Sequence, residues 1–442
     1  MAPNQNMNTK FRAALRNELP IWIREGLVSE DAAAHLSSTY QLSNLKEESS
    51  RLLSAVIFTI GGLLLGGGVI SFVAANWEDI STPVKLAILF SALLGFHAVG
   101  YWLWRSAGWR RLGHALIFCG CLVFGANIGL VAQIFHIRGD WYGAFGAWAV
   151  GSLVMAWALR SWIIGVLVLC TSFLWFIGFQ DDNHQRAAVL YPFVLAIALI
   201  PLAWIIPSRV LYAGTLLGIV IAAGVIAGNH GSANQTLLSM GAGGLFMWTL
   251  GELHRAAGWR REFANITAGL GLSVLAATAY IWSFHDLWNT PKLRLMQSLL
   301  GILFLALSIA ATFLLWRRER QTHPWLIIGV LVVGSLLTCA SLINGEISFT
   351  IITNLAALTL AAVMIGMSLI DEQRVVFWLG SLYLVLLILS RFLEYETSLL
   401  VKSAAFLACG VAVILAGISY EKYLRRKVSS MEGNKDKEIV YE

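Results

Sequence analysis

The sequence is short of charged residues, and this shortage excludes most soluble proteins. Only 13% of the 442 residues are Asp, Glu, Lys or Arg, whereas 58% are hydrophobic and the mean hydropathy is +0.71. Soluble domains carry about 25% charged residues. Because only a helix satisfies its own backbone polar groups within lipid, the composition predicts an all-α polytopic membrane protein.

Cysteine is also scarce, and its positions argue against a metal site. The five cysteines lie in apolar runs, and no CxxC pair occurs. No His, Cys or carboxylate cluster has the spacing of zinc ligands. We therefore expect no metal, no cofactor and no disulfide framework. The net charge of +6 comes from basic residues beside apolar runs, so we expect the lipid bilayer as partner and no nucleic acid.

Long apolar segments recur from Leu52 onward. A helix needs about 20 such residues to cross the hydrocarbon layer. The pattern predicts fourteen spans, at 52–75, 84–104, 112–135, 144–159, 162–179, 187–206, 210–228, 236–250, 263–284, 295–316, 325–343, 347–370, 375–392 and 399–420.

The distribution of Lys and Arg predicts the orientation of these spans. With a cytoplasmic N-terminus, 24 of the 31 basic residues fall on the cytoplasmic side, as the positive-inside rule requires. The first fifty residues are polar and show no signal peptide. Both termini are therefore predicted to be cytoplasmic.

The flanking segments are predicted to differ from the spans. Residues 1–50 are expected to form a cytoplasmic helical domain: one helix reaches Pro20, a second ends at Gly26, and Ser29 caps a third stretch. Its predicted packing face comprises Leu19, Trp22, Ile23 and Leu27. This domain either docks on the cytoplasmic loops or binds a protein partner. Residues 424–442 are expected to be a disordered cytoplasmic tail.

A seven-residue segment occurs twice. Arg-Ser-Ala-Gly-Trp-Arg-Arg at 105–111 returns as Arg-Ala-Ala-Gly-Trp-Arg-Arg at 255–261, with six identities at a displacement of 150 residues. A weaker echo relates 162–167 to 325–331. Together they predict two parallel six-helix repeats, 51–206 and 207–370, followed by a two-helix appendage, 371–423. The repeated loops are explained by membrane topology alone; the alternative is contact with a lipid headgroup or the N-terminal domain.

Candidate site residues fall into two groups. Within the spans, His97 is the one ionisable side chain that we place near a helix centre, with Asn127 and Asn354 as polar companions. Such a histidine is either an interhelical hydrogen-bond partner or a proton carrier. The second group lies at predicted outer helix ends and comprises Asn76, Trp77, Glu78, Asp79, Gln133, His136, Asp140, Arg391, Glu394 and Lys402. If these loops converge they form a rim of mixed charge; otherwise they are ordinary solvated loops.

Several motifs in the first 165 residues resemble a known family. They are Gly-Leu-Val-Ser at 26–29 with Tyr40, Phe-Val-Ala-Ala-Asn-Trp at 72–77, Gln-Ile-Phe-His-Ile at 133–137 with Gly139-Asp140, and Ala-Trp-Ala-Leu-Arg-Ser at 156–161. Together they resemble the bacterial membrane proteins of domain of unknown function 2157. The resemblance implies a location in the bacterial cytoplasmic membrane, but no activity.

Three functions are compatible with these features. A carrier or flippase-like protein for a small or amphiphilic solute fits the number of helices and the repeat. A non-catalytic envelope scaffold fits the N-terminal domain and the tail. An enzyme acting on a lipid-linked substrate at the outer face would use Glu78 and Asp79. We expect the carrier first and an enzyme last, with no catalytic residue, substrate or oligomeric state assigned.

Overall fold

The computed structural model describes residues 9–40, 80–106, 109–181, 185–228, 233–258, 260–284, 299–318, 346–371, 374–394 and single residues between 400 and 422. All regular structure in these ranges is helical. The chain divides into two compact units, Met1–Ser91 and Ala92–Glu442. The predicted boundary at residue 50 and the spans 52–75 and 325–343 lie outside the described ranges.

The first unit contains a helical hairpin. Helix α1 (Thr9–Arg24) and helix α2 (Glu30–Thr39) are joined by a turn in which Gly26 has φ +69°. The Ser29 hydroxyl accepts a hydrogen bond from the Ala32 amide at 3.3 Å, so Ser29 caps α2 as predicted. A small core forms around the side chains of Leu15, Leu19 and Ala33.

Two expectations for this hairpin are wrong. Pro20 lies inside α1 and does not end it. A proline there loses one backbone hydrogen bond and crowds the carbonyl four residues earlier, and the packing of Leu15 and Leu19 with Ala33 of α2 offsets this cost. Leu27 is 68% exposed, whereas Trp22 and Ile23 pack against the core as predicted.

The remaining helices are long and mostly apolar. Helix α4 (Thr82–Arg105) runs through the division between the units. The second unit continues with α5 (Arg110–Ile134), α6 (Trp141–Leu159), α7 (Trp162–Asp181), α8 (Gln185–Ala188), α9 (Tyr191–Ile205), α10 (Arg209–Gly228), α11 (Ala233–Ala256), α12 (Arg261–Trp282), α13 (Leu299–Arg318), α15 (Glu346–Asp371) and α16 (Arg374–Glu394). Nine helices in the described ranges are long and apolar enough to cross a membrane.

These helices begin and end within a few residues of the predicted spans. The main difference is the span predicted at 187–206, which is divided into α8 and α9. Pro192 lies in the first turn of α9, where its missing N–H leaves no intrahelical bond unmade, so a new helix begins there. The shorter predicted span at 236–250 extends in both directions to form α11. The total of fourteen spans stays a prediction.

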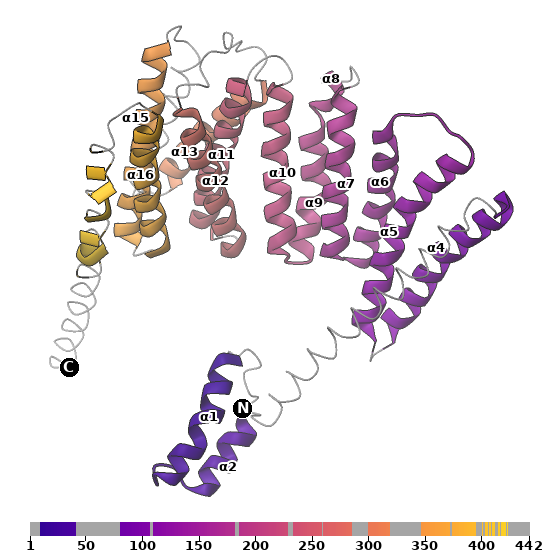
Figure 1. Ribbon diagram of the computed structural model, residues 1–442, viewed down its shortest axis with the longest axis horizontal. Coiled ribbons are helices and arrows are strands. Elements are labelled where there is room, and N and C mark those ends of the chain that lie inside the picture. Colours follow the sequence, from indigo (N-terminus) through magenta and orange to yellow (C-terminus); the bar gives the residue numbers. More distant parts are fainter. Residues whose placement is uncertain are drawn as a thin grey trace. The chain divides into compact units, whose positions relative to one another are not determined.

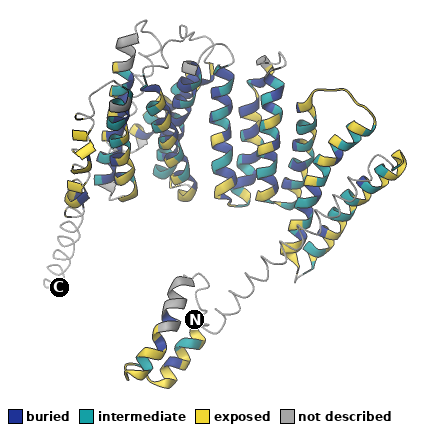
Figure 2. Ribbon diagram, viewed as in Figure 1, coloured by how far each residue is buried: buried dark blue, intermediate teal, exposed yellow. Residues whose placement is uncertain are grey.

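Within the second unit the helices pack in a row (Figure 1). Helix α6 contacts α7, α7 contacts α9 and α10, α10 contacts α11 and α12, and α12 and α16 both contact α15. The core lies towards the middle of this row, where Leu199, Leu202 and Leu211 are fully buried. Buried residues concentrate on the inner faces of the helices (Figure 2).

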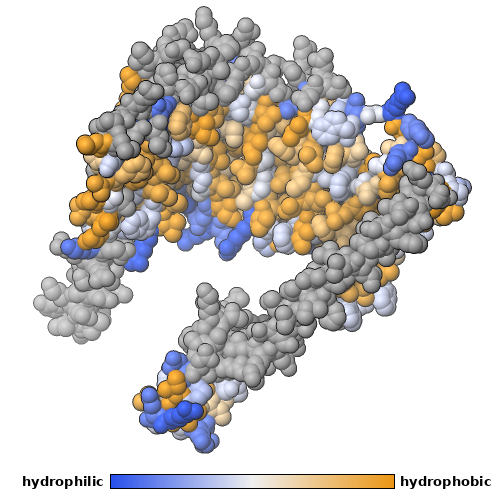
Figure 3. Space-filling view, in the orientation of Figure 1, coloured by the Kyte–Doolittle hydropathy of each residue, from blue (hydrophilic) through white to orange (hydrophobic). Residues whose placement is uncertain are grey.

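The outward faces of these helices are hydrophobic (Figure 3). Val150, Val154 and Ile197 are each at least 65% exposed. A soluble protein rarely exposes contiguous apolar surface on this scale. The chain is therefore a membrane-embedded, multi-pass protein.

Arginines gather at one end of the second unit. They lie where α4 joins α5, α6 joins α7, α9 joins α10 and α11 joins α12, and polar residues follow this edge in Figure 3. Because successive helices run in opposite directions, these connections share one end. The structure thus brings together the arginines that the sequence assigned to one side of the membrane.

Candidate functional site

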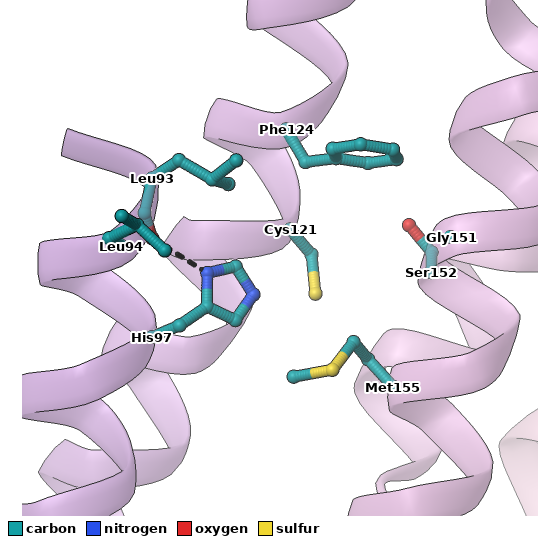
Figure 4. Close-up of a pocket in the computed structure, with 8 residues that line it drawn as sticks. All are labelled: Leu93, Leu94, His97, Cys121, Phe124, Gly151, Ser152 and Met155. Atoms are coloured by element: carbon teal, nitrogen blue, oxygen red, sulfur yellow. Dashed lines mark hydrogen bonds between the residues drawn. The ribbon is translucent and has the colours of Figure 1, made fainter. Parts of the chain in front are cut away.

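A cavity of about 280 Å³ lies among α4, α5 and α6 (Figure 4). Its position near the middle of these helices places it inside the predicted spans. The lining residues are mostly apolar and come from all three helices: Leu93, Leu94, His97, Cys121, Phe124, Gly151, Ser152 and Met155. None of them carries a carboxylate, an ammonium or a guanidinium group.

His97 presents one ring nitrogen to this cavity. Its Nδ1 lies 2.8 Å from the carbonyl oxygen of Leu93. Because a carbonyl only accepts, Nδ1 carries the proton, and in the neutral ring Nε2 is left as an acceptor. Figure 4 shows Nε2 facing the side of the cavity that holds Cys121.

Two glycines create the space for these side chains. A Cβ at Gly120 would lie 2.5 Å from Cε1 of His97, so the imidazole packs directly on the backbone of α5. A Cβ at Gly151 would lie 2.4 Å from Cε1 of Phe124. The indole N–H of Trp148 donates to the Cys121 carbonyl at 2.8 Å and fastens α6 to α5.

Ser152 is the most deeply buried polar group in the cavity wall, at 1% exposed. In the described part of the chain its hydroxyl has no hydrogen-bond partner. A buried hydroxyl without a partner costs about 1–3 kcal/mol. The site therefore combines apolar walls with an unused hydroxyl from Ser152 and an acceptor nitrogen from His97.

The cavity is reached from the outer surface of the helices beside Leu94, which is 66% exposed. The cavity therefore has an opening beside an exposed apolar side chain.

The family comparison covers this site. Residues 20–165 match the family described as predicted membrane protein, DUF2157. The match confirms the resemblance found in the sequence. All three helices that line the cavity lie inside the DUF2157 region. Most of α7 and all of the later helices lie outside that region. No curated protein matches the chain, and no solved structure matches it.

Beyond the DUF2157 region, a polar cluster joins the ends of α12, α15 and α16. The Ser283 carbonyl accepts hydrogen bonds from Arg391 Nη1 at 2.6 Å and from Asn354 Nδ2 at 3.2 Å. Arg391 also forms an ion pair with Glu394, and the two side chains are 19% and 9% exposed. The structure thus unites Asn354, predicted within a span, with Arg391 and Glu394, predicted at the outer rim.

This cluster clamps the C-terminal end of α12. The guanidinium carbon of Arg391 lies 4.6 Å from the ring centre of Phe284, and Tyr383 donates from α16 to the Ala276 carbonyl at 3.0 Å. These bonds connect protein groups to one another. We therefore interpret the cluster as structural.

The other predicted site residues lie elsewhere. Gln133 is exposed in the last turn of α5, and His136 and Asp140 are exposed in the connection between α5 and α6. Tyr142 in α6 donates to Asp140 Oδ2 at 3.1 Å. Figure 1 shows this connection at the opposite end of the row from α15 and α16. Asn127 is buried on α5 at 8% exposed and does not line the cavity. Asn76, Trp77, Glu78, Asp79 and Lys402 lie outside the described residues.

The companions of His97 were missed by sequence reasoning. Cys121, Ser152 and Met155 sit in apolar spans, and helical periodicity does not reveal which faces of separate helices meet. The usable signal was the pairing of a glycine with a small polar residue, Gly120 with Cys121 and Gly151 with Ser152. Among the described residues, no three His, Cys, Asp or Glu side chains could hold a metal ion.

Proposed function

We propose that this protein is a membrane carrier that binds a small apolar or amphiphilic solute in the cavity among α4, α5 and α6. The observation that carries the proposal is the buried hydroxyl of Ser152, which lacks a partner in the described structure and faces an otherwise apolar space. A solute with one hydrogen-bonding group and an apolar body would satisfy both features. Pockets for small molecules have this composition, apolar walls with a few polar groups.

The charges around the site also favour such a solute. A carrier of ions usually keeps a charged residue near the middle of the membrane, and none lines this cavity. The ionisable side chains among the lining residues are the imidazole of His97 and the thiol of Cys121. Any coupling to protons would therefore run through His97.

Binding can be measured with 1-aminoanthracene, a small fluorescent amine, on the full chain in nanodiscs. Ser152→Ala keeps the cavity but removes the hydroxyl, and we expect about fivefold weaker binding, equivalent to about 1 kcal/mol. Ser152→Leu fills the cavity and is expected to abolish binding. Val154→Leu is the matched control, because Val154 lies on the exposed side of α6. Equal affinity for all four proteins would contradict the proposal.

Transport itself is tested in liposomes. We expect Ser152→Leu to abolish flux of solutes that compete with the probe. If His97→Ala leaves proton-dependent flux unchanged, His97 has no part in the mechanism.

We further propose that the chain lies in the bacterial cytoplasmic membrane with both termini in the cytoplasm. The arginines at one end of the second unit support this orientation through the positive-inside rule. Cysteines introduced at Arg110 or Arg260 should resist an impermeant thiol reagent applied from outside. Labelling at either position would show that the chain has the opposite orientation.

An envelope scaffold is the second candidate, because the α1–α2 hairpin leaves Ile21 45% and Leu27 68% exposed. Such apolar side chains suit a protein partner that binds through residues 1–50. Co-purifying proteins lost after Ile21→Ser and Leu27→Ser, with binding of the probe retained, would favour this function. The enzyme hypothesis depends on Glu78 and Asp79, outside the described residues, and stays a prediction.

A further inference from the structure

The repeated segments 105–111 and 255–261 occupy the same structural position. The first joins α4 to α5 and the second joins α11 to α12, at the end of the second unit where arginines gather. The three arginines of each segment are retained: Arg105, Arg110 and Arg111 in the first, Arg255, Arg260 and Arg261 in the second. Their surroundings differ.

In the second segment, protein groups satisfy two of the three arginines. Arg255 donates to Asn265 Oδ1 at 2.8 Å and pairs with Glu252 at 2.5 Å. Arg260 donates to the Trp204 carbonyl at 2.7 Å. A second carboxylate, Glu262, lies in the first turn of α12. Glu262 itself pairs with Arg209. Within the described residues, one charge of this segment, that of Arg255, is thus paired with a carboxylate, and the Arg260 guanidinium is hydrogen-bonded to a carbonyl.

The first segment has no counterpart of the two carboxylates or of the Asn265 amide. At the displacement of 150 residues, Glu252, Glu262 and Asn265 correspond to Trp102, Leu112 and Ala115. Arg105 donates to the hydroxyl of Tyr101 at 3.1 Å, and the Arg110 guanidinium lies 5.9 Å from the ring centre of Trp104. None of the three arginines has a carboxylate partner within the described part of the chain.

Local helix geometry adds to this positive charge. Helix α5 begins with Arg110 and Arg111, has no acidic residue in its first turn, and receives no side-chain cap from Trp109. The N-terminal end of a helix is itself partially positive, so cations there are unfavourable unless an anion approaches. Helix α12 has Glu262 in the equivalent turn.

Exposed aromatic residues flank these arginines. Trp102 is 68% exposed and Trp109 is 61% exposed. Tryptophan is enriched at the level of lipid headgroups, where its ring is amphipathic. The segment therefore presents three guanidinium groups between aromatic rings, at the end of two membrane helices.

We propose that the segment 105–111 binds the headgroups of anionic phospholipids and that its counterpart 255–261 does not. Guanidinium groups bind phosphate oxygens through paired, charge-assisted hydrogen bonds, and the exposed tryptophans rest in the same interfacial layer. This proposal is independent of the cavity and of any carrier activity.

The test is native mass spectrometry of the full-length protein titrated with phosphatidylglycerol, with phosphatidylcholine as the neutral lipid. Each basic residue near a membrane surface contributes about 1 kcal/mol, or about fivefold in affinity. We expect Arg110→Gln with Arg111→Gln to weaken phosphatidylglycerol binding about 25-fold and to leave phosphatidylcholine binding unchanged. Leu112→Glu, which introduces the acid found in the second segment, should weaken it about fivefold.

Matched variants provide the control. Arg111 and Arg261 are equivalent and both exposed, so Arg111→Gln should weaken binding about fivefold and Arg261→Gln by less than twofold. Thermal unfolding in phosphatidylcholine identifies any variant that is misfolded, and Leu112→Gln separates charge from shape. Equal losses for Arg111→Gln and Arg261→Gln would overturn the proposal. Displacement of the lipid by millimolar inorganic phosphate would also overturn it, since it would indicate a site for soluble anions.

Discussion

The helix pairs α4–α5 and α11–α12 are joined by nearly the same seven residues, yet they belong to different surroundings. In the most apolar stretches of α4 and α5, 11% and 22% of the residues are buried, whereas in that of α12 the proportion is 39%. The second pair is more deeply packed, and its Arg255 is paired with Glu252. The first pair borders a cavity and leaves its arginines available. A local motif therefore sets the direction of the chain, while the packing around it decides what remains free to bind.

The largest loss of stability is expected from breaking the buried ion pair between Arg391 and Glu394. Arg391→Gln removes one charge of the buried Arg391–Glu394 ion pair, which should lower the free energy of unfolding by about 3–5 kcal/mol. The matched surface pair is Arg209 with Glu262, at 65% and 67% exposed, where Arg209→Gln should cost less than about 1 kcal/mol. Chemical unfolding in detergent measures both. Similar losses of unfolding free energy for the two variants would show that the Arg391 pair is no more buried than the Arg209 pair.

A buried and an exposed tryptophan allow the same comparison for packing. Trp248 on α11 is 1% exposed and Trp102 on α4 is 68% exposed. Trp248→Ala opens a void in the core and should cost about 3 kcal/mol or more, whereas Trp102→Ala should cost less than about 1 kcal/mol. Thermal unfolding followed by circular dichroism compares them. A Trp102→Ala variant as unstable as Trp248→Ala would show that α4 is packed like the core.

A smaller effect is expected beside the cavity. A Cβ at Gly120 collides with the ring of His97, and since that ring borders open space it can turn away, so Gly120→Ala should cost about 1–2 kcal/mol and weaken binding of 1-aminoanthracene. Gly129→Ala on the same helix is the control, because nothing lies within 4 Å of its added Cβ. If Gly120→Ala changed neither stability nor binding, the close contact between His97 and α5 would be wrong.

Much of this architecture follows from the sequence because hydropathy and flanking charge act locally. The ends of α10 and α12 fall within two residues of prediction, and the arginines lie at one end of the second unit. The break before α9 was missed, since the apolar run continues through Pro192. The placement of His97 and Ser152 around one cavity was missed for another reason. It depends on how three helices cross, and close contacts at Gly120 and Gly151 shape that crossing.

A density map of the full chain in nanodiscs at side-chain resolution tests the central claim most directly. We predict density that is not protein in the cavity among α4, α5 and α6, within hydrogen-bond distance of the Ser152 hydroxyl, and its disappearance in Ser152→Leu. A cavity closed by the collapse of Phe124 and Met155, with Ser152 bonded to its own helix, would contradict it.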